Sequence, residues 1–483
     1  MHTLNNPQLF QQACFINNQW IANKDTLTVN NPFTGKQIGT VPMLSASDID
    51  QAITHASTAL TLWSTKTAKE RAEFLHAWAD LIDQHKDDLA HIMTLEQGKP
   101  LKEAKGEIGY ANSFVRWFAE EGKRVYGDTI PATRANLRHL VLKQPIGVCA
   151  AITPWNFPAA MITRKVAPAL AAGCTIIVKP ASQTPFSALA LAYLAKEAGL
   201  PQGVLQVVTG KASAIGKQLA SDERITKLSF TGSTDTGRTL MTQCSNTLKK
   251  LSMELGGNAP FIVFDDANLE QAVDGLIASK YRNAGQTCVC ANRIYVQNDI
   301  KNDFLALLKD KVSMLNVGNG LDNDTDIGPL INQDALDKTQ HLLKDALAKG
   351  ATLVAGGTPH PTHTTCFLPT IIADITDEMC VAHEEIFAPI APVFAFDDEQ
   401  EVIKKANNTI YGLAAYFYTN DVGRAWRVSE QLEYGMVAQN TGMLSTEVAP
   451  FGGIKQSGFG REGSKYGIDE YLITKYWCIN IDS

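Results

Sequence analysis

Short apolar runs alternate with helix-like segments from residue 148 onward, and this rhythm constrains the fold more than any other feature. The runs span residues 148–152, 175–178, 204–208 and 227–230. Strands that alternate with helices predict βαβ units and a parallel sheet. A second alternating region covers residues 261–445. The sequence therefore predicts an α/β protein, whose ligands bind at the carboxyl ends of the parallel strands.

Two further regions complete the expected organisation. Residues 47–125 carry apolar side chains at three- and four-residue spacing, which predicts helices. Residues 137–142 and 471–481 are β-prone, and long exposed strands are a liability unless they are paired. We expect these two segments to pair with each other or with another subunit. A chain of 483 residues is too long for one core, so two or three domains are expected.

Charge and cysteine content narrow the partners and the compartment. The net charge is −7 and no long basic run occurs, so neither nucleic acid nor an anionic membrane is an expected partner. No stretch reaches the roughly 18 apolar residues of a transmembrane helix, and residues 1–10 carry no signal pattern. Nine cysteines without a C-x-x-C pair favour a cytoplasmic protein without a disulfide framework. No H-E-x-x-H motif occurs, so no metal is expected.

Cys288 is the candidate nucleophile. It follows Gly285 and two polar residues, which suits an exposed loop. A thiol attacks carbonyl carbon well when it is partly ionised and accessible. Cys290 would face the opposite way in an extended segment, and core packing is its expected role. A reversible Cys288–Cys290 link stays open, although such a short loop would be strained.

Glu254 is the candidate base. It lies between Met253 and Leu255 at the end of a strand-like run, and a carboxylate in such surroundings can have a raised pKa. Alternatively, Glu254 caps a turn or pairs with Lys249 or Lys250.

Asn156 lies in a loop that two prolines stiffen, directly after the first strand of the predicted sheet. An immobile amide donor suits stabilisation of an oxyanion, whereas the alternative is an amide that satisfies its own turn. Lys179 and Ser182 follow the second strand, where a parallel sheet meets a nucleotide. Residues 230–237 end the fourth strand and open a helix. Their glycines and hydroxyl side chains can bind pyrophosphate at the start of that helix.

These segments, in this order, resemble the aldehyde dehydrogenase superfamily over nearly the whole chain. The matching motifs are Pro154-Trp155-Asn156-Phe157-Pro158, Lys179-Pro180, Phe230-Thr231-Gly232-Ser233, Glu254-Leu255-Gly256-Gly257, Gly285-Gln286-Thr287-Cys288, Glu385-Ile386-Phe387 and Pro450-Phe451-Gly452-Gly453. The resemblance implies a Rossmann-type cofactor-binding domain, an α/β catalytic domain with Cys288 and a small β oligomerisation segment. The expected boundaries are 1–128 with 146–256, then 257–450, and 129–145 with 451–483.

The resemblance also implies the roles of the site residues. Cys288 is the implied nucleophile, Glu254 the base that activates the hydrolytic water, and Asn156 with the Cys288 backbone N–H the oxyanion hole. The reaction then passes through a thiohemiacetal and a thioester on Cys288. The implied cofactor contacts are Thr153, Pro154, Trp155, Lys179, Ser182, Gly210, Phe230, Gly232, Ser233, Leu255, Glu385 and Phe387. Without the resemblance, residues 384–389 read as a solvated loop and residues 450–458 as a tight turn.

Residues 161–165, 281–293 and 451–458 are similar to the succinate-semialdehyde dehydrogenase subfamily, which implies oxidation of succinate semialdehyde in 4-aminobutyrate degradation. In that subfamily, residues matching Arg164, Arg282 and Ser445 bind the substrate carboxylate, and arginine can clamp a carboxylate bidentately. For either arginine the alternative is a surface ion pair. Glutarate semialdehyde is one methylene longer, a difference worth only about 1–3 kcal/mol in a pocket, so it stays an alternative substrate.

The cofactor preference depends on Ser182. NAD-preferring members of the family carry an acidic residue there, which would repel a 2′-phosphate; Ser182 removes that repulsion and Lys179 can pair with the phosphate. We therefore predict NADP, with NAD as a weaker alternative. Family members are commonly homodimers or homotetramers. The competing functions are a cofactor-free thiol hydrolase, a non-catalytic binding protein on the same scaffold and a dehydrogenase of neutral aldehydes.

Overall fold

The computed structural model describes residues 4–361 and 365–481. Its first sheet has eight strands in the order β19-β11-β10-β7-β8-β9-β1-β2. The five central strands are parallel to one another, and β1, β2 and β19 pair antiparallel at the two edges. The strands are β7 (Val148–Ile152), β8 (Thr175–Lys179), β9 (Leu205–Val207), β10 (Ile225–Thr231), β11 (Lys250–Glu254), β1 (Cys14–Ile16), β2 (Gln19–Ile21) and β19 (Gly458–Phe459). The predicted parallel sheet is confirmed.

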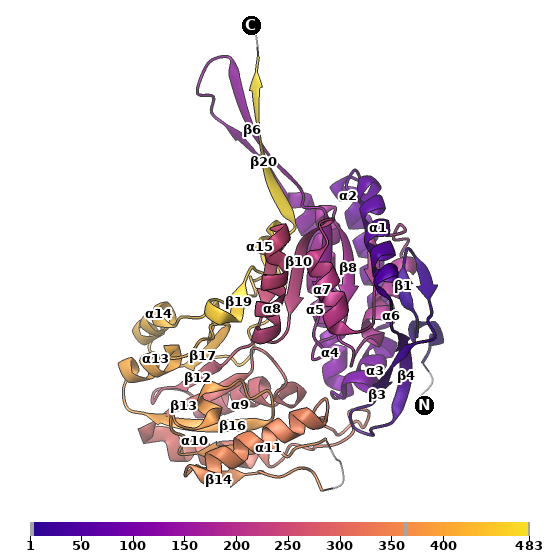
Figure 1. Ribbon diagram of the computed structural model, residues 1–483. Helices are drawn as coiled ribbons and strands as arrows, with labels where there is room; N and C mark the ends of the chain where they lie inside the picture. Colours follow the sequence, from indigo (N-terminus) through magenta and orange to yellow (C-terminus); the bar gives the residue numbers. More distant parts are fainter. Residues whose placement is uncertain (1–3, 362–364, 482–483) are drawn as a thin grey trace.

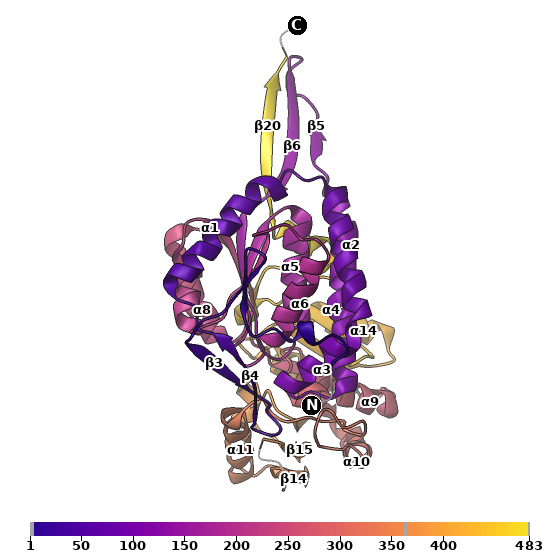
Figure 2. The ribbon, with the colours of Figure 1, turned by 90° about the vertical axis from the view of Figure 1, so that its right-hand side faces the viewer.

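Helices cover both faces of this sheet (Figure 2). Apolar side chains of α2, α3, α4, α5 and α6 form the core on one face, and those of α1, α7 and α8 form the core on the other. The helices are α1 (Ala46–Trp63), α2 (Ala68–Gln84), α3 (Lys86–Gln97), α4 (Leu101–Glu121), α5 (Ala160–Ala172), α6 (Phe186–Glu197), α7 (Ala212–Ser221) and α8 (Thr234–Cys244). Capping boxes start α1 and α2, where Ser45 and Thr67 exchange hydrogen bonds with the residue three positions on. The predicted helical region 47–125 is therefore confirmed.

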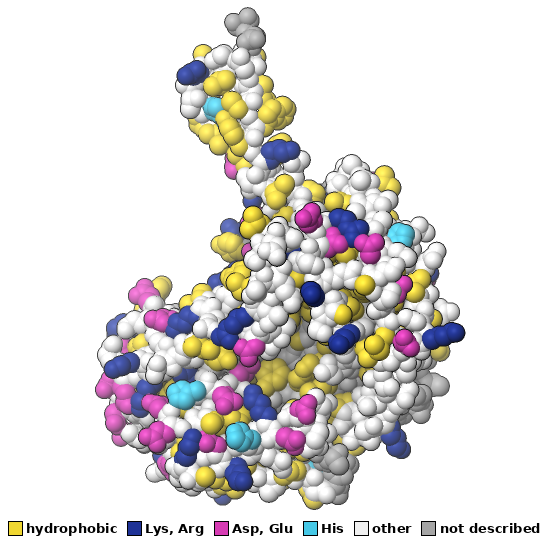
Figure 3. Space-filling view, in the orientation of Figure 1, with side chains coloured by type: hydrophobic (Ala, Val, Ile, Leu, Met, Phe, Trp, Pro, Cys, Tyr) yellow, Lys and Arg dark blue, Asp and Glu magenta, His cyan; other side chains and the backbone are white. Residues whose placement is uncertain are grey.

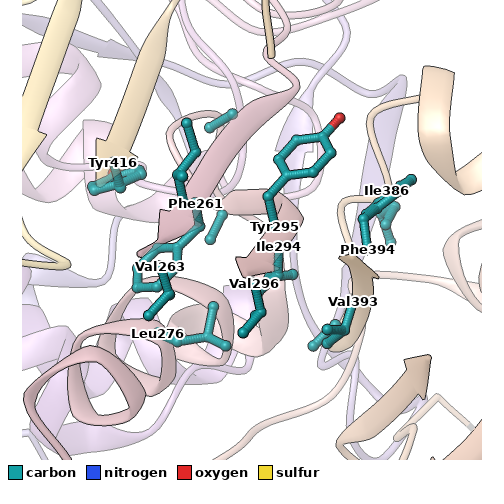
Figure 4. Close-up of a cluster of buried hydrophobic side chains, with 14 of the residues drawn as sticks. Phe261, Val263, Leu276, Ile294, Tyr295, Val296, Ile386, Val393, Phe394 and Tyr416 are labelled. Atoms are coloured by element: carbon teal, nitrogen blue, oxygen red, sulfur yellow. The ribbon is translucent and has the colours of Figure 1, made fainter. Parts of the chain in front are cut away.

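The second sheet has seven strands in the order β14-β15-β16-β13-β12-β17-β18, parallel except for β14. Buried side chains of adjacent strands, such as Phe261, Ile294 and Val393, lie in register and pack into one core (Figure 4). The strands are β12 (Ala259–Val263), β13 (Ala291–Gln297), β14 (Thr352–Ala355), β15 (Thr370–Ala373), β16 (Ile390–Phe396), β17 (Ala414–Tyr418) and β18 (Met436–Gln439). Its main helices are α9 (Leu269–Lys280), α10 (Lys301–Val312), α11 (Gln333–Ala348), α13 (Glu399–Asn407) and α14 (Val422–Gln431).

A three-stranded arm projects from the body, and β20 and β6 extend furthest along it (Figure 1). Strand β20 (Leu472–Asn480) pairs antiparallel with β6 (Leu137–Pro145) along its whole length, and β5 (Asp128–Ile130) pairs with β6 on the other side. The prediction that the two β-prone segments pair with each other is confirmed. Apolar side chains gather on the arm (Figure 3), among them Tyr476 at 59% and Trp477 at 51% exposure.

The two sheets place the ends of distant segments side by side. The loops after β7, β10 and β11 leave the first sheet at the carboxyl ends of its strands, which lie together because the strands are parallel. The loop between α9 and β13 in the second sheet carries Cys288. No helix in the two described ranges is long and apolar enough to cross a membrane. The chain thus has an α/β fold with two mainly parallel sheets and small antiparallel ones.

Candidate active site

An unusual backbone presents Cys288. Asn283, Ala284 and Gly285 follow one another in the left-handed region, with φ values of 52°, 55° and 74°. A Cβ at position 285 would lie 2.3 Å from the carbonyl oxygen of Ala388, so only glycine fits there. The chain then turns tightly, with the Cys290 N–H donating to the Thr287 carbonyl at 3.0 Å. The predicted loop is confirmed, and its turn leaves Cys288 partly exposed.

Two cavities meet at Cys288. The first is lined by the loop after β7, the loop after β10, the turn after β11 and side chains of the second sheet's domain: Pro154, Trp155, Asn156, Thr231, Gly232, Ser233, Leu255, Gly256, Cys288, Ala335, Lys338, Glu385, Ile386 and Phe387. The second is lined by α4, α5 and the loops around them: Lys99, Glu103, Gly106, Glu107, Tyr110, Phe157, Met161, Arg164, Arg282, Thr287, Cys288, Val289, Met443, Ser445 and Phe451. The Cys288 thiol therefore lies where the two cavities meet.

The environment of Cys288 keeps its thiol protonated. Burial raises the pKa of Cys288 to about 12, and the nearby carboxylates of Glu385 and Glu254 act in the same direction. The cations Arg164 and Arg282 oppose this rise. A thiol with this pKa needs a base, or a change in its surroundings when ligands bind, before it can attack. Cys290 is 5% exposed, so the prediction of core packing is confirmed, and both cysteines are free thiols.

Glu254 ends β11 as a buried carboxylate, and neither of its oxygens has a hydrogen-bond partner in the described part of the chain. Burial raises its pKa well above the ordinary range, and Glu462 raises it further, while Arg164 lowers it. The alternative pairing is wrong, because Lys249 donates to backbone carbonyls and Lys250 contacts the Asp469–Glu470 segment. A buried carboxylate without hydrogen-bond partners is costly for the fold, and its raised pKa suits a general base.

Glycine lets the turn after Glu254 pass directly against the loop that carries Cys288. A Cβ at position 257 would lie 2.4 Å from the carbonyl oxygen of Cys288. The Gly232 N–H donates to the Glu254 carbonyl at 3.0 Å, and the Ser457 hydroxyl donates to the Gly256 carbonyl at 2.7 Å. These bonds fix the turn, so the first sheet brings the end of β11 to the loop of Cys288.

Asn156 is tied to the same loop. Its Nδ2 donates to the Gln286 carbonyl at 3.0 Å, while its buried Oδ1 has no partner among the described residues. Its backbone carbonyl accepts from Lys99 Nζ at 2.8 Å and from Asn283 Nδ2 at 3.1 Å. The amide therefore does not satisfy its own turn; it reaches across to the chain that carries Cys288.

Glu385 and Phe387 line the first cavity. The Glu385 carboxylate accepts from the Gly257 N–H at 2.9 Å, and burial raises its pKa to about 7. Phe387 has φ 57° and its ring meets Trp155 edge-on at 5.6 Å between centroids. The reading of residues 384–389 as a solvated loop is wrong at these positions, because both side chains face the cavity.

Five of the predicted cofactor contacts lie outside both cavities. Lys179 ends β8, and burial lowers its pKa to about 8. Ser182 lines a separate cleft together with Glu96. The others are buried around the loops: Thr153 after β7, Phe230 whose ring packs beneath Gly232, and Gly210, whose φ is 146°. The other predicted cofactor contacts line the first cavity beside Cys288, whereas these five lie near the ends of the strands.

The two predicted arginines differ in their partners. Arg164 Nη2 lies 2.6 Å from Glu462 Oε2, an ion pair that is buried and whose atoms are not aligned for a hydrogen bond. Its guanidinium also lies over the Phe451 ring at 3.9 Å. Arg282 has no ion pair in the described ranges, and its buried Nε has no hydrogen-bond partner. The surface ion pair is therefore wrong for both arginines, and the guanidinium of Arg282 lies over the Phe157 ring, 5.3 Å from its centroid, without a carboxylate partner in the described ranges.

Sequence reasoning missed several polar residues that line the cavities, among them Lys338, Lys99 and Glu107. Lys338 of α11 lines the first cavity and its Nζ donates to the Glu385 carbonyl at 2.6 Å. Lys99 and Glu107 line the second cavity as a buried ion pair at 2.5 Å. Lys338 and Glu107 belong to ordinary helical patterns, and Lys99 follows a helix end, so no local signal marks them. Across the described residues no group of three or more His, Cys, Asp or Glu side chains could hold a metal ion.

Comparison with known proteins identifies the scaffold. The aldehyde dehydrogenase family matches residues 20–477. The NADP(+) succinate-semialdehyde dehydrogenase of Escherichia coli is 58% identical over 480 residues, which cover 99% of this chain and 100% of that protein. A glutarate-semialdehyde dehydrogenase of Pseudomonas aeruginosa is 57% identical and covers 99% of each chain. The crystal structure of succinate-semialdehyde dehydrogenase from Burkholderia pseudomallei has a TM-score of 0.98 at 56% identity, over 99% of this chain and 100% of that chain.

The family match spans nearly the whole chain, and the relatives match it end to end in sequence and in structure. Succinate- and glutarate-semialdehyde dehydrogenases stand at similar identity, so the comparisons place the chain near both groups. The fold, the thiol between two cavities and these matches lead to one conclusion. This chain belongs to the aldehyde dehydrogenase family.

Proposed function

We propose that this enzyme oxidises succinate semialdehyde to succinate with NADP in the cytoplasm, as a step of 4-aminobutyrate degradation. The observation that best supports this proposal is the place of Arg282. This cation has no ion-pair partner in the described chain, and it lines the same cavity as Cys288. A semialdehyde has a carboxylate at its far end, which such an arginine can bind while the aldehyde meets the thiol. Glutarate semialdehyde is the alternative substrate, and the name of the Pseudomonas aeruginosa relative favours keeping it.

The residues along the first cavity fit a nicotinamide dinucleotide. Gly232 and Gly256 leave space at the wall, Ser233 caps the N-terminus of α8 and the Glu385 carboxylate faces inward. In this proposal Glu385 and Phe387 hold the nicotinamide ribose, Ser233 and Gly232 the pyrophosphate, and Lys179 with Ser182 the adenosine ribose and its 2′-phosphate. The remaining proposed contacts are Thr153, Pro154, Trp155, Gly210, Phe230 and Leu255. NADP, when bound, supplies the hydride acceptor for the oxidation.

The chain's own residues carry out the other steps. The Cys288 thiol gives its proton to a water molecule, the thiolate adds to the aldehyde carbon, and the carbonyl oxygen becomes an alkoxide held by Asn156 Nδ2 and the Cys288 backbone N–H. Loss of hydride from that carbon leaves a thioester on Cys288. Glu254 takes a proton from a water molecule, whose oxygen attacks the thioester carbon. The carbon–sulfur bond then breaks, the acid leaves and the thiolate of Cys288 is regenerated.

Arg282 and Arg164 have different roles in this proposal. Arg164 is already balanced by Glu462, so its charge mainly holds that buried carboxylate and adds a weaker pull on an anion. Arg282 is directed to the substrate carboxylate, and Ser445 lines the same cavity and can donate a hydroxyl to it. The larger part of the affinity for the substrate anion therefore belongs to Arg282.

Replacing Arg282 with alanine is expected to raise KM for succinate semialdehyde about 10- to 100-fold, because a charge-assisted bond of about 1.5–3 kcal/mol is lost. KM for butanal, which has no carboxylate, should change by less than about threefold, since it never used that bond. Steady-state NADPH formation with succinate semialdehyde, glutarate semialdehyde and butanal measures both effects. Arg116→Ala removes an exposed arginine of α4 and serves as the matched control. Equal KM changes for all three aldehydes would remove Arg282 from substrate recognition.

The wild-type enzyme is expected to show a higher kcat/KM with NADP than with NAD. Ser182→Glu should lower kcat/KM with NADP by about tenfold or more, because a carboxylate near the 2′-phosphate costs on the order of 1–2 kcal/mol. Ser182→Gln keeps the volume without the charge and controls for steric effects. Comparable or better kcat/KM with NAD in the wild type would overturn the NADP assignment.

Cofactor affinity is expected to rise with pH through the pKa of Glu385, which is about 7. The ionised carboxylate accepts hydrogen bonds from ribose hydroxyls, and the protonated form gives up most of that capacity, so Kd should fall between pH 6 and pH 8. Titration with NAD isolates this effect, since the 2′-phosphate of NADP itself titrates near a pKa of about 6. Glu385→Gln should bind NAD without that pH dependence. An unchanged pH dependence in the variant would assign it to another group.

We assign residues 1–128 and 146–256 to cofactor binding, 257–450 to catalysis, and 129–145 with 451–483 to subunit contact. The exposed aromatic side chains of the arm support a homodimer or homotetramer, because a projecting apolar strand is stable when another subunit covers it.

A further inference from the structure

We propose that Lys99 is a positioning residue for the oxyanion hole, and this inference rests on the proposed function of Asn156. Lys99 lies between α3 and α4 at the wall of the second cavity, and its side chain is only 1% exposed. No part of the proposed reaction needs a buried lysine there. Burying an ammonium is costly unless it makes excellent contacts, so the contacts it makes indicate its role.

The ammonium of Lys99 joins α4 to the loop of Asn156. Nζ donates to Glu107 Oε2 at 2.5 Å and to the Asn156 carbonyl at 2.8 Å, and it lies 4.0 Å from the centre of the Phe157 ring. A carbonyl bonded to a cation that is itself paired with a carboxylate is held strongly. Lys99 thus fixes the peptide that follows Asn156.

Glu107 holds the far end of the same loop. Its second oxygen, Oε1, accepts from the backbone N–H groups of Ala159 at 3.0 Å and Ala160 at 3.2 Å, where α5 begins. These N–H groups have no partner inside the helix, and a carboxylate there also complements the helix dipole. The pair Lys99–Glu107 therefore holds the loop at Asn156 and again three residues later.

Asn283 extends the network to the nucleophile loop. Its Nδ2 donates both to the Asn156 carbonyl at 3.1 Å and to the Gln286 carbonyl at 3.2 Å. Its own backbone N–H donates to Glu103 Oε2 at 2.9 Å, and its Oδ1 accepts from Gln97 Nε2 at 2.9 Å. Residues 97–107 therefore contact both the loop of Asn156 and the loop of Cys288.

This arrangement matters because the two donors of the proposed oxyanion hole come from different sheets. Asn156 follows β7 of the first sheet, and the Cys288 N–H precedes β13 of the second. Oxyanion stabilisation depends on donors fixed before the reaction, and a misplacement of about 1 Å can cost on the order of 100-fold in rate. Lys99 acts through the Asn156 carbonyl without touching the reacting atoms, so it sets the distance between the two donors.

The test is Lys99→Met in the full-length enzyme, a change that keeps an unbranched apolar side chain at this position and removes the donor. The first-turnover rate of NADPH formation from succinate semialdehyde should fall about 10- to 100-fold. Hydrolysis of 4-nitrophenyl acetate, which forms the same kind of oxyanion, should fall in parallel. Alkylation of Cys288 by iodoacetamide should stay within about threefold of wild type, because displacement at a saturated carbon develops no oxyanion. Lys102→Met, an exposed lysine three residues on, is the matched control.

A double-mutant cycle with Asn156→Ala separates positioning from general damage. If Lys99 acts through Asn156, Lys99→Met should slow the Asn156→Ala enzyme by less than about threefold. Glu107→Gln, which keeps the cap on α5 and removes the charge that holds Lys99, enters the same cycle and decides the question if Lys99→Met does not fold. Additive losses, a first-turnover rate close to wild type, or a parallel fall in alkylation would overturn the inference. An Asn156→Ala enzyme as fast as wild type would instead overturn the proposed role of Asn156.

Discussion

Replacing Cys288 with alanine is expected to lower kcat/KM for every aldehyde by about 10⁴-fold or more, because covalent catalysis loses its only nucleophile. The cavities on both sides keep their walls, so NADP should still bind with a Kd close to that of the wild type. Stopped-flow measurement of NADPH formation and fluorescence titration of the cofactor give the two quantities. An alanine variant that keeps more than about one-hundredth of the activity would show that the thiol is not the nucleophile.

Cys290→Ala is the matched control, since this second thiol is buried two residues away and points toward the Lys280 and Ala291 carbonyls. Its loss should change kcat/KM by less than about fivefold through small packing effects. The same pair of variants addresses the open question of a Cys288–Cys290 link. Reversible inactivation by a mild oxidant that disappears in Cys290→Ala would demonstrate the link, and equal inactivation of both enzymes would exclude it.

The fold could be predicted because its pattern is local. Four strands of the first sheet, β7, β8, β9 and β10, correspond to short apolar runs, and the parallel arrangement brings the carboxyl ends of those runs together whatever their exact bounds. The same local pattern predicts that Asn156, Lys179 and Ser233 lie at strand ends. It also explains why the arm was predictable, since two long β-prone segments without other partners are most stable when paired.

The partners of charged side chains could not be predicted in the same way. Arg164 pairs with Glu462, and Lys99 bonds to the Asn156 carbonyl, contacts between residues 298 and 57 positions apart. No periodicity carries such information, because burial of a charge depends on how separate elements pack. The same limit made a surface ion pair a reasonable expectation for Arg164. For the same reason the sequence did not predict which cavity Ser182 lines, and the structure puts it in a cleft apart from Cys288.

Replacing Glu254 with glutamine should separate the two halves of the reaction. We expect one NADPH per active site in a first turnover, followed by a steady state slowed about 10²- to 10⁴-fold, because water is no longer deprotonated. Mass spectrometry of the quenched enzyme should find the acyl group on the peptide that carries Cys288. Glu73→Gln, on the exposed face of α2, is the control for a surface carboxylate. Loss of the first turnover as well would place Glu254 before hydride transfer, as the group that takes the thiol proton.

Chemical rescue and pH dependence sharpen this test. Hydroxylamine attacks a thioester without a protein base, so it should restore turnover in Glu254→Gln and add little to the wild type. Burial and Glu462 raise the pKa of Glu254 well above its ordinary range. Only the ionised form can take a proton from water, and the wild-type steady-state rate should therefore increase as pH rises through that raised pKa. The glutamine variant has no such group, so its slow rate should lose that dependence, and a pH profile unchanged by the substitution would assign the base to another residue.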